Sequence, residues 1–98
     1  MTMGTPITTL DPAARPRLAR HVRLRFDPTR DRHVLLGPET VVVLNGTGAD
    51  VLALCDGARS AAGILAALRE RYGDVAEAEV SRFLTGLAAR RWVELADG

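Results

Sequence analysis

The chain has 98 residues, which suffices for one domain and excludes a large enclosed catalytic cavity. Hydrophobic residues make up 47% of the sequence and charged residues 26%, the balance of a folded domain rather than of a disordered chain. The net charge is only +1, because 13 arginines are opposed by 12 acidic residues. A protein dedicated to binding nucleic acid normally carries a broader basic surface, so this balance argues against that class.

No feature of the sequence indicates secretion, a membrane span or a bound metal. The single cysteine, Cys55, cannot form a disulfide within the chain, and no Cys and His residues have the spacing of a zinc site. Residues 1–10 lack the basic and apolar regions of a signal peptide, and no apolar run approaches about 18 residues. We therefore expect a cytoplasmic protein without a cofactor and without membrane association.

The N-terminal segment predicts a flexible arm followed by a strand. Residues 1–16 contain three prolines and show no apolar periodicity, which is typical of an arm without regular structure. The pattern changes at residue 17, after which Val22, Leu24 and Phe26 alternate with arginines. This period of two is that of a half-buried strand.

Two more strands are expected before the first helix. Residues 33–36 and 40–44 are apolar runs, and each is closed by residues that favour turns, Gly37-Pro38 and Asn45-Gly46. The short connections predict an antiparallel meander, in which His33 lies opposite Phe26.

The second half of the chain has the period of helices. The first helix is expected to start near Thr47, as its capping residue, and to stop at Asp56-Gly57. The second is bounded by Ser60 as N-cap and by Gly73, and it has a clean apolar stripe between them.

A third helix is expected to begin at Asp74 as N-cap, because Glu77 follows at the spacing of a capping box. Its apolar stripe consists of Val80, Phe83, Leu84, Leu87 and Ala88. Residues 92–95 form a short apolar tail that is strand-like.

These elements predict an α+β fold, with a three-stranded antiparallel sheet followed by three helices in a winged helix-turn-helix-like arrangement. The expected organisation is an arm at residues 1–16, a winged-helix-like domain at 17–95 and a frayed terminus at 96–98.

Four short segments together resemble the family of PqqD, the coenzyme PQQ synthesis protein D. They are Arg17-x-x-Arg20-His21-Val22-Arg23-Leu24, Leu36-Gly37-Pro38-Glu39, Val42-x-Leu44-Asn45-x-Thr47 and Leu52-x-Leu54-Cys55-Asp56-Gly57. No single segment is specific, but their order and the chain length match that family from about residue 15 to residue 95. The resemblance implies a peptide chaperone in the biosynthesis of the cofactor pyrroloquinoline quinone (PQQ). Such a protein binds the precursor peptide PqqA and presents it to the radical SAM enzyme PqqE.

The third strand is the expected docking edge for the peptide. Its five residues are Thr40, Val41, Val42, Val43 and Leu44. Val41 and Val43 point away from the face that carries Val42 and Leu44, so one pair should lie outside the core. An exposed apolar edge invites another strand, and an added peptide strand would satisfy it. Burial of this pair under the third helix or a dimer partner is the alternative.

The third helix is expected to supply the other wall of the groove. Val80, Phe83, Leu84 and Leu87 form a stripe that is usually plain core, but one flank is free to line a groove. Arg82 and Arg90 are candidates to meet acidic side chains of the peptide, although solvated arginines are the ordinary outcome. Arg23 and Arg25 share one strand face, where they either attract an acidic partner or keep the sheet soluble.

No catalytic or metal-binding pattern is present, so we expect a protein that is not an enzyme. His21 and His33 are not opposed in the expected register and have no third ligand, and Cys55 ends an apolar helical face. A winged-helix DNA-binding protein is the main alternative, but the acidic start of the third helix would repel phosphate. A homodimer through the free strand edge is a third interpretation.

Overall fold

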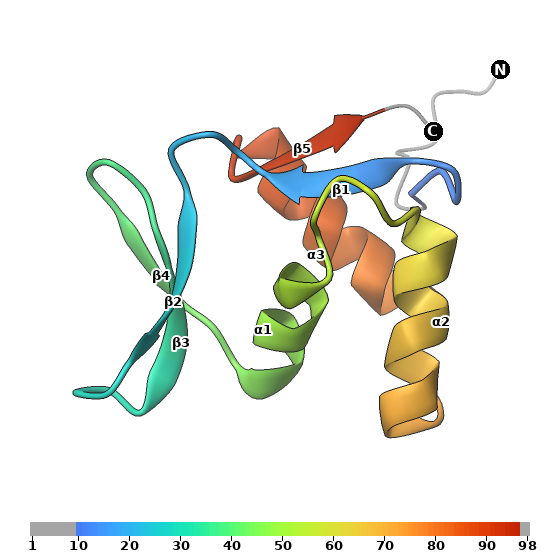
Figure 1. Cartoon of the computed structure of the whole chain (residues 1–98), viewed down its shortest axis with the longest axis horizontal. Coiled ribbons are helices and arrows are strands. Elements are labelled where there is room, and N and C mark those ends of the chain that lie inside the picture. Colours follow the sequence, from blue (N-terminus) through green and yellow to red (C-terminus); the bar gives the residue numbers. More distant parts are fainter. Residues whose placement is uncertain (1–9, 97–98) are drawn as a thin grey trace, which may run out of the picture.

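The computed structural model describes residues 10–96, which form two small antiparallel sheets and three helices (Figure 1). The order along the chain is β1 (Arg15–Leu18), β2 (Arg23–Asp27), β3 (Arg32–Leu36), β4 (Val41–Val43), α1 (Gly46–Ala53), α2 (Ala61–Tyr72), α3 (Glu77–Ala89) and β5 (Val93–Ala96). The α+β class and the run of three meander strands followed by three helices are as the sequence predicts. Within residues 10–96, no helix is long and apolar enough to cross a membrane.

The larger sheet has the strand order β2-β3-β4, and the register between β2 and β3 is the predicted one. Phe26 lies opposite His33, and the two rings meet edge to face with their centroids 5.1 Å apart. The face that carries Leu35 and Val42 packs against the helical core, and Leu35 has no exposed surface. The three-stranded sheet therefore projects from the helices with one face buried and the other turned away from them (Figure 1).

A second sheet, of two strands, was not predicted. β1 pairs with β5 over four residues each, so that Arg15 lies opposite Ala96 and Leu18 opposite Val93. The strand predicted from the alternation of Val22, Leu24 and Phe26 is confirmed as β2, but β1 before it was not foreseen. A turn separates the two strands, where the Val22 N–H donates to the Ala19 carbonyl at 3.0 Å. The strand-like tail is confirmed as β5, which includes Ala96; residues 97–98 lie outside the described part.

The boundary of the predicted arm is also wrong. Residues 1–9 lie outside the described residues, but Leu10 and Ala14 are buried and belong to the main core cluster. The Ala14 carbonyl accepts from the Ala61 N–H at 2.7 Å, and the Pro12 carbonyl accepts from the Ala62 N–H at 3.1 Å. Residues 10–16 are thus fixed to the start of α2, by backbone bonds that the prolines of this segment do not prevent.

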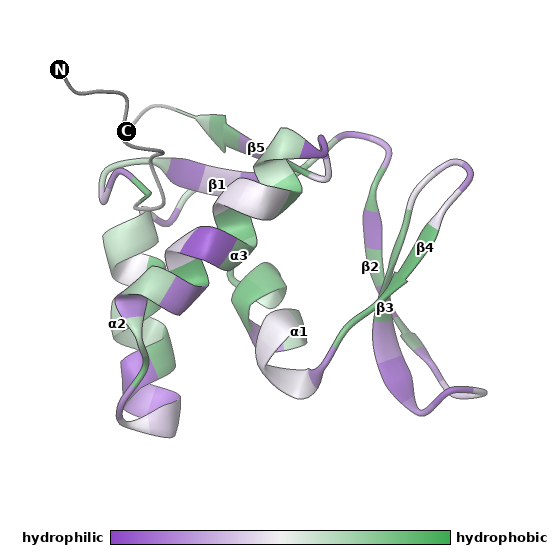
Figure 2. Ribbon diagram, turned by 180° about the vertical axis from the view of Figure 1, so that it is seen from behind, coloured by the Kyte–Doolittle hydropathy of each residue, from purple (hydrophilic) through white to green (hydrophobic). Residues whose placement is uncertain are grey.

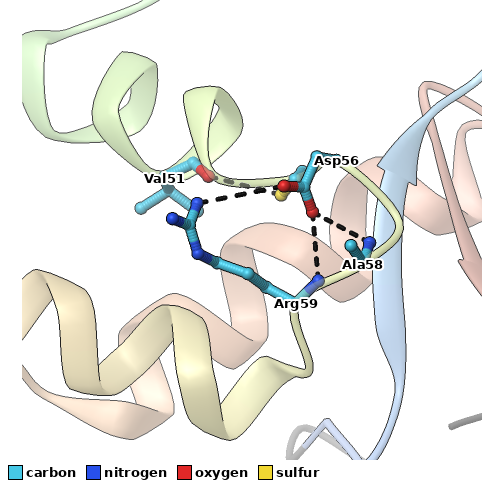
Figure 3. Close-up of polar contacts among 5 residues, drawn as sticks. Val51, Asp56, Ala58 and Arg59 are labelled. Carbon is cyan, nitrogen blue, oxygen red and sulfur yellow. Dashed lines mark hydrogen bonds and ion pairs between the residues drawn. The ribbon is translucent and has the colours of Figure 1, made fainter.

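The segment that joins α1 to α2 is a compact turn built on Asp56 (Figure 3). Its Oδ1 accepts hydrogen bonds from the Arg59 N–H at 3.0 Å and the Ala58 N–H at 2.8 Å, which hold the pKa of this carboxyl below its ordinary value. The Gly57 N–H donates to the Pro16 carbonyl at 2.9 Å, so the turn is tied to β1. The Cys-Asp-Gly part of the family-like motif therefore has a structural role at this junction.

We expect Gly57→Ala to destabilise the domain by about 1–2 kcal/mol, the cost of forcing a residue with a Cβ into the left-handed region. Gly57 has a φ of +81°, and a Cβ there would meet the side chain of Arg17 at 3.4 Å. Gly46→Ala is the matched control, because nothing lies within 4 Å of a Cβ at that position. Thermal unfolding followed by circular dichroism checks the difference, and equal melting temperatures for the two variants would refute it.

The helix starts agree only in part with the predicted caps. Ser60 caps α2 as expected, with its Oγ accepting from the Gly63 N–H at 3.1 Å, and α2 ends at Gly73. The cap of α1 is Asn45 rather than Thr47, since its Oδ1 accepts from the Gly48 N–H at 2.6 Å. α3 begins after Ala76, which makes no side-chain cap bond, so the capping box predicted at Asp74 does not form.

Candidate functional site

β4 is an edge strand with a run of three valines, and the hydropathy colouring marks it as apolar (Figure 2). Val42 is half-buried and packs against the core, whereas the side chains of Val41 and Val43 are 47% and 48% exposed. Burial of Val41 and Val43 beneath the third helix, one of the alternatives left open by the sequence, is therefore not found within the described residues. Thr40 lies in the turn before β4, and Leu44 is buried just after it.

The backbone of β4 alternates between bonds to β3 and groups at the free edge. The Leu44 N–H donates to the His33 carbonyl at 2.9 Å, and the Gly37 N–H donates to the Thr40 carbonyl at 2.9 Å. In an antiparallel ladder every second residue faces the partner strand, so Val42 belongs to the same bonded set as Leu44. The N–H and C=O groups of Val41 and Val43 consequently point outward, where an added strand would find them.

An apolar pocket of about 280 Å³ lies next to the end of β4, between the start of α1 and the first half of α3. Its lining residues are Asn45, Thr47, Gly48, Val51, Val75, Ala76, Glu79, Val80 and Phe83. A dry apolar cavity of roughly 150 Å³ is enough to hold benzene, so this pocket has room for one large apolar side chain. The chain leaves β4 at Val43 and reaches the pocket wall at Asn45, two residues later.

Close packing of α1 against Phe83 shapes this pocket. A Cβ at Gly48 would lie 3.2 Å from the Phe83 ring and 3.0 Å from the Asn45 Oδ1, so only glycine allows both neighbours their present positions. Phe83 is half-buried and packs on the core with one part of its ring. The other part is left to line the pocket.

The predicted third-helix residues divide into two groups. Val80 and Phe83 line the pocket, but Leu84 has no exposed surface and Leu87 is 7% exposed, so these two belong to the core and offer a ligand no surface. Arg82 and Arg90 are exposed and are not among the residues that line the pocket. The charged residue at the pocket is instead Glu79, which the sequence analysis did not select.

The site residues that were missed come mainly from the start of α1. Asn45 and Thr47 belong to the Leu-Asn-x-Thr segment noted in the sequence, where they were interpreted only as a turn and a cap. Asn45 is indeed the cap, but it also forms a wall of the pocket. The family-like segment was the available signal, because it connects the predicted docking strand directly to these residues.

The candidate catalytic groups have no geometry for chemistry. Burial raises the pKa of the Cys55 thiol to about 12, and its Sγ donates to the Val51 carbonyl at 3.3 Å, so at neutral pH it is a protonated core thiol. His21 and His33 are both exposed. Among residues 10–96 no three His, Cys, Asp or Glu side chains gather as metal ligands do.

A free strand edge and an apolar pocket on a small α+β domain are features that peptide-recognition domains share. The chain belongs to the PqqD family, coenzyme PQQ synthesis protein D, whose model matches residues 32–93, more than half of the chain.

Relatives and a solved structure agree with this membership. A PqqA binding protein of Pseudomonas aeruginosa is 44% identical over 82 residues, covering 82% of this chain and 89% of that protein. PqqA binding proteins of Azotobacter vinelandii and Rhodopseudomonas palustris are 45% and 47% identical over 82 and 70 residues; the matches cover 82% and 71% of this chain and 89% and 69% of those proteins.

The solution NMR structure of the PqqD truncation of Methylobacterium extorquens PqqCD is similar in fold, with a TM-score of 0.74 and 38% sequence identity. The match covers 89% of this chain and 96% of that one. That structure is described as a functional and stand-alone recognition element for ribosomally synthesized and post-translationally modified peptides.

Proposed function

We propose that this chain is a peptide chaperone of PQQ biosynthesis, which binds the precursor PqqA as an added strand along β4 and presents it to the radical SAM enzyme PqqE. The observation that carries the proposal is the free edge of β4, with the backbone groups of Val41 and Val43 directed outward, next to the apolar pocket. The names of the relatives, PqqA binding proteins, supply the identity of the peptide.

The bound strand supplies two kinds of contact. Backbone hydrogen bonds to Val41 and Val43 give affinity that depends little on the peptide sequence, whereas the pocket lined by Val80 and Phe83 selects an apolar side chain. Glu79, rather than Arg82 or Arg90, is the charged residue at the pocket. A peptide residue next to it is therefore expected to be basic or neutral rather than acidic.

In this proposal the chain performs no chemistry and acts by raising the local concentration of peptide at the enzyme. We expect PqqE to turn over free PqqA slowly and to become faster as this protein is added, until the protein equals the peptide in amount. A plateau at a small fraction of the peptide concentration would instead indicate that one molecule of the protein delivers many peptides in succession. Any mass change in PqqA incubated with the purified chain alone would contradict a purely binding role.

The acidic residues at the start of α3 argue against the DNA-binding alternative. The first turn of α3 carries Glu77 and Glu79, which would face phosphate if this helix entered a groove of DNA. We expect a gel shift to show only weak binding that is lost as salt is raised.

A further inference from the structure

One face of the three-stranded sheet takes no part in the proposed peptide site, which consists of the free edge of β4 and the pocket between α1 and α3. Directly opposed residues of an antiparallel sheet share a face, so the register places Arg23, Leu36 and Val41 in one row and Arg25, Val34 and Val43 in the next. We call these six residues the outer sheet face. It is the side of the sheet opposite Leu35, which packs on the core.

The part of the outer sheet face that lies on β4 is apolar and exposed. Val41 and Val43 are about half exposed, and they are among the few large apolar side chains with that much exposure within residues 10–96. Val34, in the middle strand, is 3% exposed but is not part of the main core cluster, so the side chains of its own face cover it. The face is thus a small apolar layer with no helix packed on it.

The border of this face on β2 is positively charged and has no carboxylate partner. The Nη1 atom of Arg23 donates to the carbonyls of Arg20 and Val22 at 3.1 Å, and that of Arg25 donates to the Leu24 carbonyl at 3.4 Å. None of the four ion pairs found in the described part of the chain includes either arginine. Asp27, the acid of β2, is already paired with Arg30.

Addition of a peptide strand would enlarge this face. Strands in a sheet are about 4.8 Å apart and alternate side chains point to opposite faces, so a peptide on β4 would extend the outer sheet face by every second of its own side chains. β3 and β4 would lie between the peptide and β2 with its arginines. A partner lying on this face would therefore touch β2, β4 and the bound peptide together.

We propose that the outer sheet face is a second docking surface, which binds a folded protein whose own surface carries an apolar patch bordered by carboxylates. This inference rests on the proposed function, in which that protein is the peptide-modifying enzyme. An apolar centre with a charged rim is the usual anatomy of a protein–protein interface, and the unpaired arginines make the required partner acidic. Docking here leaves the pocket between α1 and α3 open for the peptide.

The test compares two double charge reversals with PqqE as the probe. Arg23→Glu with Arg25→Glu changes the outer sheet face, and Arg59→Glu with Arg69→Glu makes the same change in net charge on exposed residues near and on α2. Binding of PqqE to each variant saturated with PqqA is measured at two salt concentrations, and binding of PqqA is measured separately. Circular dichroism establishes that both variants are folded.

We expect the outer-face variant to bind PqqE about tenfold more weakly than wild type and with a flatter salt dependence, and the α2 variant to stay within about twofold. Both should bind PqqA within about twofold of wild type.

Equal PqqE affinity for the two variants would overturn the proposal. A parallel loss of PqqA affinity in the outer-face variant would also overturn it, because the arginines would then belong to the peptide site. Self-association of the wild type that the outer-face variant loses would make a second copy the occupant and overturn it too. Failure of the wild type to bind PqqA would refute the proposed function itself.

Discussion

Val43→Pro should weaken the binding of PqqA by about tenfold or more while the domain stays folded. The substitution removes a backbone N–H that points to the free edge of β4 and places the proline ring where the peptide strand would lie. Loss of one net hydrogen bond accounts for up to about 1.5 kcal/mol, which is roughly tenfold in the dissociation constant, and the steric block adds to it. Isothermal titration calorimetry with PqqA measures the change.

Two neighbouring substitutions serve as controls for this result. Val43→Ala keeps the N–H and should lose less than about threefold in affinity. Val42→Pro removes an N–H that belongs to the ladder with β3, so it should lower the melting temperature more than Val43→Pro does. If folded Val43→Pro bound PqqA as tightly as Val43→Ala, the edge of β4 would not be the docking site.

Phe83→Ala and Leu84→Ala should separate binding from stability, although the two residues are adjacent on α3. Phe83 lines the pocket, so its truncation should cost about tenfold or more in PqqA affinity and roughly 2 kcal/mol of stability, since the ring is only half-buried. Leu84 has no exposed surface, so its truncation should cost about 2–5 kcal/mol of stability through the cavity it leaves.

The folded fraction of Leu84→Ala is expected to bind PqqA like wild type. Chemical denaturation and calorimetry on the same samples give both quantities for each variant. If both variants lost PqqA affinity in proportion to their loss of folding stability, Phe83 would be an ordinary core residue and the pocket would not hold the peptide.

The sheet that carries the site could be predicted because its signals are local. The turn between β2 and β3 fixes which residues face each other, and this was enough to place Phe26 opposite His33. The alternation of exposed and buried valines in β4 follows from the same period of two. Local turn chemistry also identified Ser60 as the cap of α2.

The second sheet could not be predicted because its partners are far apart in the sequence. β1 contains Pro16, which is usually a sign against a strand, and its partner β5 lies at the other end of the described chain. An isolated β-bridge between Arg17 and Asp56 and the bonds from Ala61 and Ala62 hold the segment in place, and none of these neighbours is close to it in the chain. A segment of this kind looks like an arm when it is read alone.

The sequence also could not show which apolar residues of α3 line the pocket and which belong to the core. Val80, Phe83, Leu84 and Leu87 are all apolar and recur at helical spacing, so the pattern shows that they share one side of the helix but not what covers each of them. Coverage is decided by α1, whose Gly48 lets the helix approach Phe83 while Leu84 is enclosed in the core. Distant segments thus determine which residues line the pocket.

Amide hydrogen exchange of the labelled protein, with and without PqqA and resolved by residue in NMR spectra, tests the central claim most directly. In the free protein the outward N–H groups of Val41 and Val43 should exchange faster than those of Val42 and Leu44, which are bonded to β3. Saturation with PqqA should slow exchange at Val41 and Val43 and shift the amides of residues 76–83 on the pocket side of α3. Unchanged exchange at Val41 and Val43, with shifts gathered instead on β1, β5 or α2, would contradict strand addition along β4.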